Sequence, residues 1–317
     1  MTCFDQTAAD AARARQSTLT KPQGSLGRLE DLAIFMAGWQ GNPRPDLDRV
    51  QAVVFAGNHG IVGQGITPFP AEVTAGMVQN FRNGGAAINQ ICAVAGADLQ
   101  VEALELDKPT ADFTRQPAMT HAEVHAAMQR GAEVVDPSCS MLLLGEMGIG
   151  NSTVSAALAA VTFGGVAEDW VGPGTGAVGP MLAEKIRVVT EGLSLHSPKT
   201  TVETLAAFGG REQAAICGAI LRARQLRIPV MLDGFICCAA AGVLTRDDQD
   251  ALAHCLIGHE SAEPGHRRLI GALAMQPVLS LDMRLGEGSG AAVALMVLRA
   301  ALACHNGMAT FAEAGLE

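Results

Sequence analysis

A single glutamate stands among glycines in the segment 283–290, which reads Met-Arg-Leu-Gly-Glu-Gly-Ser-Gly. Glycine lets the backbone approach a ligand closely and adopt positive φ angles. The apolar run that follows, residues 291–298, is typical of a buried helix. The pattern therefore places Glu287 at the mouth of a helix with little around it to block a ligand. Two interpretations remain, a general base or an acid favoured by the helix dipole.

A second glycine-rich loop contains Glu146 and follows residues 141–144, a short apolar run typical of a buried strand. The loop leads into an alanine-rich helical stretch, residues 154–162. Backbone N–H groups at such a helix start commonly bind phosphate, although the segment matches neither a Walker loop nor a dinucleotide fingerprint. The alternative is a tight turn with an ordinary helix cap. The positions that would hold a ligand here are Gly148, Asn151, Ser152 and Thr153.

A third glycine-rich loop, residues 171–176, contains Gly174 and is followed by a helical pattern that contains Lys185. Lysine is a natural point-charge partner for a phosphate, and a solvated surface lysine is the alternative. Another apolar strand pattern, residues 229–232, ends at Asp233 and Gly234.

Short apolar strands alternate with helical stretches along the chain, which is the pattern of a parallel sheet covered by helices on both faces. The expected strands are 50–56, 99–106, 141–144, 229–232 and 256–258. Ligands in such folds bind beyond the carboxyl ends of the strands. We therefore expect the loops that carry Glu146, Lys185, Asp233 and Glu287 to converge on one crevice.

The composition restricts the classes of partner. The chain has 317 residues, a net charge of −10, 4% aromatic residues and no tyrosine, which argues against binding nucleic acid or an anionic membrane. Arg299 interrupts the longest apolar stretch, so no transmembrane helix is predicted. Eight cysteines without a Cys-x-x-Cys pair, and no signal-peptide pattern, indicate reduced thiols in the cytoplasm.

No metal site is predicted. His121 and His125 are four residues apart but lack a third ligand in a known order, so an exposed helix face is the preferred interpretation. His259 and His266 flank a Gly/Pro-containing loop, for which hydrogen bonding within the loop is preferred over metal or ligand binding.

Six segments together resemble one enzyme family, the nicotinate-nucleotide:dimethylbenzimidazole phosphoribosyltransferases of cobalamin synthesis, often called CobT. They occur in the family's order over nearly the whole chain and comprise residues 21–30, 55–60, 145–153, 229–235, 259–266 and 283–290. The resemblance implies a Rossmann-like parallel sheet flanked by helices over residues 46–289. It also implies a smaller helical domain built from residues 1–45 and 290–317, and a homodimer.

The resemblance also implies a reaction and its residues. The family transfers the 5-phosphoribosyl group of nicotinate mononucleotide to 5,6-dimethylbenzimidazole, giving α-ribazole 5′-phosphate and nicotinate, without a cofactor. Its catalytic glutamate matches Glu287 and its substrate-binding glutamate matches Glu146. The family's phosphate positions match Gly148, Gly174, Lys185 and Gly234, and its base pocket matches the region of Phe69, Met77 and Leu285.

The sequence departs from many relatives at Asn58, Phe69 and Met77, which leaves the identity of the accepted base open. A phosphoribosyltransferase that uses a different N-heterocyclic base is therefore one alternative. A non-catalytic nucleotide-binding protein is a second, and nicotinate release separates it from an enzyme. An NAD-dependent oxidoreductase is a third, but the sequence has no good match to the combination it needs, a Gly-x-Gly-x-x-Gly loop with an acidic residue about 20 residues further on.

Overall fold

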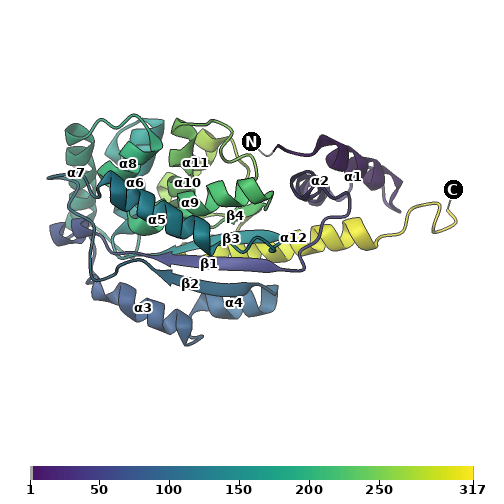
Figure 1. The fold of residues 1–317 in the computed structure, drawn as a ribbon, viewed down its shortest axis with the longest axis horizontal. Coiled ribbons are helices and arrows are strands. Elements are labelled where there is room, and N and C mark those ends of the chain that lie inside the picture. The colour runs from purple at the N-terminus through teal and green to yellow at the C-terminus, as the bar shows by residue number, and fades with distance from the viewer. Residues whose placement is uncertain (1–2, 317) are drawn as a thin grey trace.

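Five parallel strands form the central sheet of the computed structural model, which describes residues 3–316 (Figure 1). Their order is β2-β1-β3-β4-β5, an order found in doubly wound sheets. The bounds are β1 (Val50–Ala56), β2 (Asp98–Ala103), β3 (Met141–Met147), β4 (Val230–Leu232) and β5 (Cys255–Ile257), with a separate pair of β6 (His259–Glu260) and β7 (Leu279–Ser280). The predicted fold class, a parallel sheet flanked by helices, is confirmed.

Side chains that alternate along each strand build two cores, one on each face of the sheet. In β1, Val53 and Phe55 pack on one face, while Ala52 and Val54 pack on the other. Because both faces are buried, the strand consists almost entirely of apolar residues, as parallel sheets require.

Helices cover both faces. One face carries α5 (His121–Val134), α6 (Asn151–Phe163), α7 (Pro180–Leu195), α8 (Thr201–Phe208), α9 (Arg211–Leu226), α10 (Phe235–Val243) and α11 (Pro264–Leu273). The other carries α2 (Arg28–Gln40), α3 (Glu72–Arg82), α4 (Ala87–Ala95) and α12 (Ser289–Gly307), and α1 (Gln6–Thr18) packs on α2. Short 3₁₀ turns occur at Gly60–Gln64, Ala167–Asp169 and Leu244–Arg246.

Strand β3 is longer than the sequence pattern predicts. The expected strand ends at residue 144, but Gly145, Glu146 and Met147 continue the ladder by pairing with Val54, Phe55 and Ala56 of β1. Glu146 therefore belongs to the end of a strand rather than to a loop. Strand β2 ends earlier than expected, at Ala103, because the backbone turns at Glu105, where φ is +45°.

Helix α12 joins two parts of the molecule (Figure 1). Its first half contributes Ala291 and Leu295 to the core beneath the sheet, and the helix also contacts α2 and α4. Among the described residues it is the one helix long and apolar enough to match a membrane span, yet half of that stretch is buried in the protein. Arg299 also donates to the carbonyl oxygens of Ala95 and Gly96. Packing accounts for its apolar character.

The C-terminal segment lies against the end of α1, beside the far end of α12. Leu19 forms an antiparallel bridge with Thr310, and the Arg15 Nε donates to the His305 carbonyl oxygen at 2.8 Å. This agrees with a helical part built from both terminal segments, although the division at residues 45 and 290 stays a prediction, because α12, which begins at Ser289, packs with its first half against the sheet.

Candidate active site

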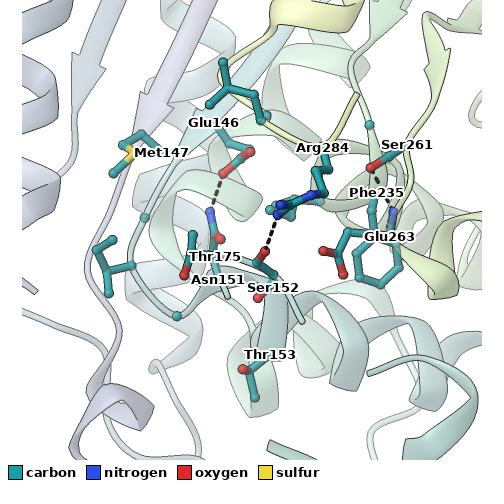
Figure 2. A pocket seen from close by; sticks show the side chains of 18 of the residues that line it. Glu146, Met147, Asn151, Ser152, Thr153, Thr175, Phe235, Ser261, Glu263 and Arg284 are labelled. Carbon is teal, nitrogen blue, oxygen red and sulfur yellow. Dashed lines mark hydrogen bonds between the residues drawn. The ribbon is translucent and has the colours of Figure 1, made fainter. Parts of the chain in front are cut away.

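The main pocket lies beyond the carboxyl ends of the strands. It is next to β1 and β3, the neighbouring strands between which the strand order of the sheet reverses. Loops far apart in sequence meet there, as expected from the alternating pattern (Figure 2). The segments that contribute lining residues are 66–67, 146–153, 173–175, 233–236, 259–263 and 284–287, together with Lys185 of α7.

Glu287 is held in an unusual backbone conformation at the start of α12. Gly286, Glu287 and Gly288 have φ angles of +82°, +64° and +85°, a left-handed region that a residue with a side chain rarely adopts. The end of β3 packs against this turn, because a Cβ added at Gly145 would lie 2.5 Å from the Gly288 nitrogen and 2.7 Å from the Glu287 carbonyl carbon. Glu287 itself is 7% exposed.

Glu146, near the end of β3, lies next to this turn. A Cβ added at Gly286 would lie 2.6 Å from the Glu146 Oε1, so only glycine leaves room for the carboxylate. The Asn151 side-chain amide, at the first turn of α6, donates to the other carboxylate oxygen of Glu146. The two glutamates predicted to act together are thus brought into one pocket.

Burial alters the acidity of both glutamates. It raises the pKa of Glu287 to about 7, with the nearby Asp233 as a second cause. It raises the pKa of Glu146 to about 8, with further contributions from the carboxyl groups of Asp233 and Glu212, while the hydrogen bond from Asn151 opposes the rise. A carboxyl group with a pKa near 7 is suited to take up a proton at neutral pH.

Lys185, on α7, supplies a buried basic group to the pocket. Its Nζ donates to the Gly172 carbonyl oxygen at 2.7 Å and to the Ser152 Oγ at 3.1 Å, and the residue is 2% exposed. Burial lowers its pKa to about 8, and the Glu263 carboxylate opposes that shift. Gly174 has a φ of +53° and lies close to this lysine, because a Cβ added at Gly174 would lie 3.1 Å from the Lys185 Nζ.

The remaining residues predicted to bind the substrate differ in whether they face the pocket. Gly148 and Gly234 line the pocket. Thr153 also lines it, but its side chain is fully buried, and Figure 2 shows it pointing away from Glu146 and Asn151. Leu285 lines the pocket with 54% of its surface exposed.

Phe69 and Met77 do not line this pocket in the described chain. Phe69 is 44% exposed, and Met77 is half-buried against the core that contains α12. The assignment of these two residues to a base pocket stays a prediction.

Arg284, Glu263 and Thr175 are among the lining residues that the sequence did not indicate as ligand-binding, although all three lie in segments that it made conspicuous. Arg284, three residues before Glu287, donates to the Gly174 carbonyl oxygen at 3.4 Å and so spans two pocket loops. Glu263 lies near Lys185, and burial raises its pKa. Thr175 follows Gly174. The charged side chains within the glycine-rich segments were the available signal.

A buried contact between a histidine and a glutamate supports the pocket, and no local sequence pattern indicates it. The His59 Nε2 lies 2.9 Å from the Glu212 Oε1, and both side chains are inaccessible to solvent. A Cβ at Gly148 would lie 3.0 Å from the His59 Nε2, so the pair supports the turn that follows β3. Its residues come from the loop after β1 and from α9, and no local pattern connects them.

The residues that the structure describes contain no group of three or more His, Cys, Asp or Glu side chains arranged to hold a metal ion. His121 and His125 lie on α5, away from the main pocket, and His259 and His266 pack against each other with ring centroids 6.4 Å apart.

The fold and pocket define a class, an α/β protein whose parallel sheet presents paired carboxylates and a buried lysine to a small ligand. A family model described as "Phosphoribosyltransferase" matches residues 1–316. The nicotinate-nucleotide–dimethylbenzimidazole phosphoribosyltransferase of Rhodobacter capsulatus is 57% identical over 98% of this chain and 93% of the relative. The Roseobacter denitrificans protein of that name is 58% identical over the same shares.

A solved structure agrees with these relatives. The crystal structure of the nicotinate-nucleotide–dimethylbenzimidazole phosphoribosyltransferase from Thermus thermophilus has a TM-score of 0.91 and 38% identity, and the match covers 99% of both chains. The chain therefore belongs to the nicotinate-nucleotide–dimethylbenzimidazole phosphoribosyltransferase family, and the resemblance seen in its sequence is confirmed.

Proposed function

We propose that this protein transfers the 5-phosphoribosyl group of nicotinate mononucleotide to 5,6-dimethylbenzimidazole, giving α-ribazole 5′-phosphate and nicotinate, in the lower-ligand branch of cobalamin synthesis. The names of its relatives support the reaction. The observation that carries it is the pocket itself, which is lined by Glu287 with a pKa of about 7, by Glu146 and by the buried Lys185.

The bond changes suit these side chains. The unprotonated nitrogen of benzimidazole attacks C1′ of the ribose, and the bond from C1′ to the nicotinate nitrogen breaks. The electron pair of that bond neutralises the pyridinium, so nicotinate leaves without needing a proton at the ring. The other benzimidazole nitrogen loses its proton to Glu287, a step that typically contributes about 10²–10⁴-fold.

Glu146 and the phosphate loops position the sugar. Positive charge develops on the ribose as the glycosidic bond breaks, as it does in glycoside hydrolysis. The Glu146 carboxyl, which enters the pocket at the end of β3, binds a ribose hydroxyl in its protonated form and stabilises that charge only in its ionised form. Lys185, together with the loop around Gly174 and the first turn of α6, binds the 5′-phosphate. Holding C1′ between these groups favours the reaction by placing the reacting atoms close together, without any further chemical step.

Purified protein mixed with nicotinate mononucleotide and dimethylbenzimidazole should release nicotinate, measured by chromatography, in amounts equal to the new nucleotide formed. Glu287→Gln should retain nicotinate mononucleotide binding by calorimetry but lose turnover by about 10²-fold or more. Turnover of this variant within a few-fold of wild type would remove Glu287 from the role of base.

The same assay separates the alternatives. Binding of nicotinate mononucleotide without any release of nicotinate would indicate a non-catalytic nucleotide-binding protein. A panel of benzimidazoles and purines, ranked by kcat/KM, identifies the base that this chain prefers. Phe69→Ser in the same panel tests whether that side chain contributes to the choice of base.

We further infer that the protein acts as a homodimer in the cytoplasm. The resemblance to the family supports the dimer, as do the exposed apolar side chains of Phe69 and Leu285, at 44% and 54%. Eight cysteines without a disulfide among the described residues agree with a reducing compartment. Light scattering of the purified protein gives the mass that tests the dimer.

A further inference from the structure

Both carboxylate oxygens of Asp233 are used by the turn that carries Glu287. The Gly288 N–H donates to the Asp233 Oδ2 at 3.1 Å, and the Ala291 N–H donates to the Oδ1 at 2.9 Å. N–H groups at the start of a helix have no partner within the helix, so a side-chain acceptor there satisfies them. Asp233 is 1% exposed, and water therefore does not compete for these bonds.

The turn needs such support because its conformation is unfavourable by itself. Glu287 has a side chain, yet its φ is +64°, and both neighbours are also left-handed. A strained residue of this kind persists only where the surrounding structure holds it. Asp233 holds the turn from the helix side, while Gly145 of β3 limits its movement from the sheet side.

His259 closes the arrangement behind Asp233. Its Nε2 lies 3.7 Å from the Asp233 Oδ1, and a Cβ at Gly234 or Gly290 would lie 2.8 Å or 2.5 Å from the same nitrogen. Three elements, β6, α10 and α12, thus pack through contacts that only glycine permits. Movement of Asp233 is restricted on each side.

We infer that Asp233 is a positioning residue, whose carboxylate fixes the start of α12 and thereby the direction in which Glu287 faces the incoming base. The inference rests on the proposed function, because it assigns Glu287 the role of base. It gives Asp233 a role through Glu287 rather than through the substrate, since both of its oxygens already accept backbone hydrogen bonds.

Charge gives this role a measurable signature. The carboxyl group of Asp233 is the neighbour that raises the pKa of Glu287 after burial. The other titratable groups that face Asp233 are Glu146 of β3, His259 of β6, and Cys237 and Cys238 of α10. Burial also raises the pKa of Asp233 itself, while His259 and the backbone N–H groups of Ala291 and Gly288 oppose that rise. Where Asp233 is ionised, removing its charge should lower the pKa of Glu287 and move the acidic limb of the kcat profile to lower pH.

The test begins with Asp233→Asn. The amide has one acceptor in place of two, so at least one backbone N–H of the turn loses its partner. A shift of the base by about an ångström can cost about 10²-fold, so kcat should fall to that extent while KM for nicotinate mononucleotide stays within about threefold. A raised KM with unchanged kcat and an unmoved acidic limb would overturn the inference.

A double-mutant cycle then shows whether Asp233 acts through Glu287. If it does, Asp233→Asn combined with Glu287→Gln should be no slower than Glu287→Gln alone, within about twofold, because residues that act as a unit are not additive. Multiplicative losses would overturn the inference and leave the proposed function intact. Wild-type turnover in Glu287→Gln alone would instead contradict the assigned base, and with it the inference.

Thr120→Ala is the matched control, since Thr120 caps α5 with its side chain far from the Glu287 turn. It should lower the melting temperature but leave kcat and its pH profile unchanged. Should Asp233→Asn fail to fold, Asp233→Ser retains one cap acceptor without the charge and enters the same comparison. Failure of Asp233→Ser to fold, with Thr120→Ala folded, would assign Asp233 to stability alone and overturn the inference.

Discussion

At the scale of single residues, burial rather than a special partner sets the chemistry of the two glutamates. Desolvation is the first cause of the raised pKa of both Glu287 and Glu146, and neighbouring carboxyl groups add to it. Charged groups removed from water favour their neutral form. The pocket therefore holds carboxyl groups that exchange protons near neutral pH, where an isolated glutamate would be ionised throughout.

The pH dependence of turnover follows from Glu287. A base must be deprotonated to act, and a pKa of about 7 means that the active fraction declines as pH falls below that value. We expect kcat to decrease by about tenfold per pH unit on the acidic side. Measurements of nicotinate release between pH 5 and 9 check this. An acidic limb near pH 4.5, the ordinary value for glutamate, would show that the pocket does not perturb Glu287.

Glu146 should reduce the stability of the ligand-free protein as pH rises. Its pKa is raised to about 8 in the folded state from an ordinary 4.5, so the folded state binds more protons than the unfolded state between these values. Stability from this group is therefore present at low pH and is lost as pH rises from about 5 to 8. Glu146→Gln should stabilise the protein by roughly 1 kcal/mol or more at pH 8, and by less at pH 5.

Urea unfolding at the two pH values measures the difference for Glu146→Gln. The exposed Glu72→Gln is the matched control, because water reaches its carboxyl group in both the folded and the unfolded protein. The same change in stability at pH 5 and pH 8 for Glu146→Gln would contradict the assigned proton uptake.

At the scale of elements, close contacts between strand ends and helix starts decide where each functional side chain lies. Gly145 lets β3 approach the Glu287 turn, and Gly174 lets its loop approach Lys185 of α7. Lys185 ties that loop to two elements, since it donates to the Gly172 carbonyl oxygen and to the Ser152 hydroxyl at the start of α6. The proposed phosphate subsite thus lies where α6, α7 and the loop meet.

Lys185→Ala should chiefly weaken binding of the phosphorylated substrate. A charge-assisted contact to phosphate contributes roughly 1.5–3 kcal/mol, so the dissociation constant for nicotinate mononucleotide should rise by about one to two powers of ten. Binding of the nucleoside without its phosphate should change little. Calorimetric titration with both ligands measures this, with the exposed Lys199→Ala as control. Equal weakening for both ligands would show that Lys185 does not bind the phosphate.

At the scale of the whole molecule, α12 connects the sheet with the helices at the chain ends. Its first residues position Glu287 and pack beneath the sheet, and its last turn meets the N-terminal segment, where the Gln16 amide contacts the His305 ring at 2.8 Å. One continuous helix therefore packs against both parts of the molecule. We therefore expect the predicted division into residues 46–289 and the terminal segments to describe the layout of the chain rather than two separately stable domains.

Unfolding should accordingly be one cooperative transition. Because α12 contributes to both parts, neither can lose its packing without the other. Differential scanning calorimetry should give a single peak whose calorimetric and van 't Hoff enthalpies agree. Nicotinate mononucleotide should raise the midpoint without splitting the peak. Two resolved transitions would show that the terminal helices form an independently stable domain.

The sequence determined the elements and the residues that meet. Most strand and helix positions followed from runs and periodicity of apolar residues, and Glu146, Lys185 and Glu287 were found within or shortly after glycine-rich segments. These features are encoded by neighbouring residues, because backbone conformation and burial patterns repeat over two to four positions. The topology of a parallel sheet then requires such loops to converge.

Tertiary structure decided the rest, because it depends on residues far apart in the chain. Pairing with β1 extended β3 through Met147 and so placed Glu146 on a strand. Packing of α12 against β4 and β6 committed both oxygens of Asp233 to the Glu287 turn. The pKa of a carboxyl group depends on how completely other segments exclude water from it, and no local pattern carries that information.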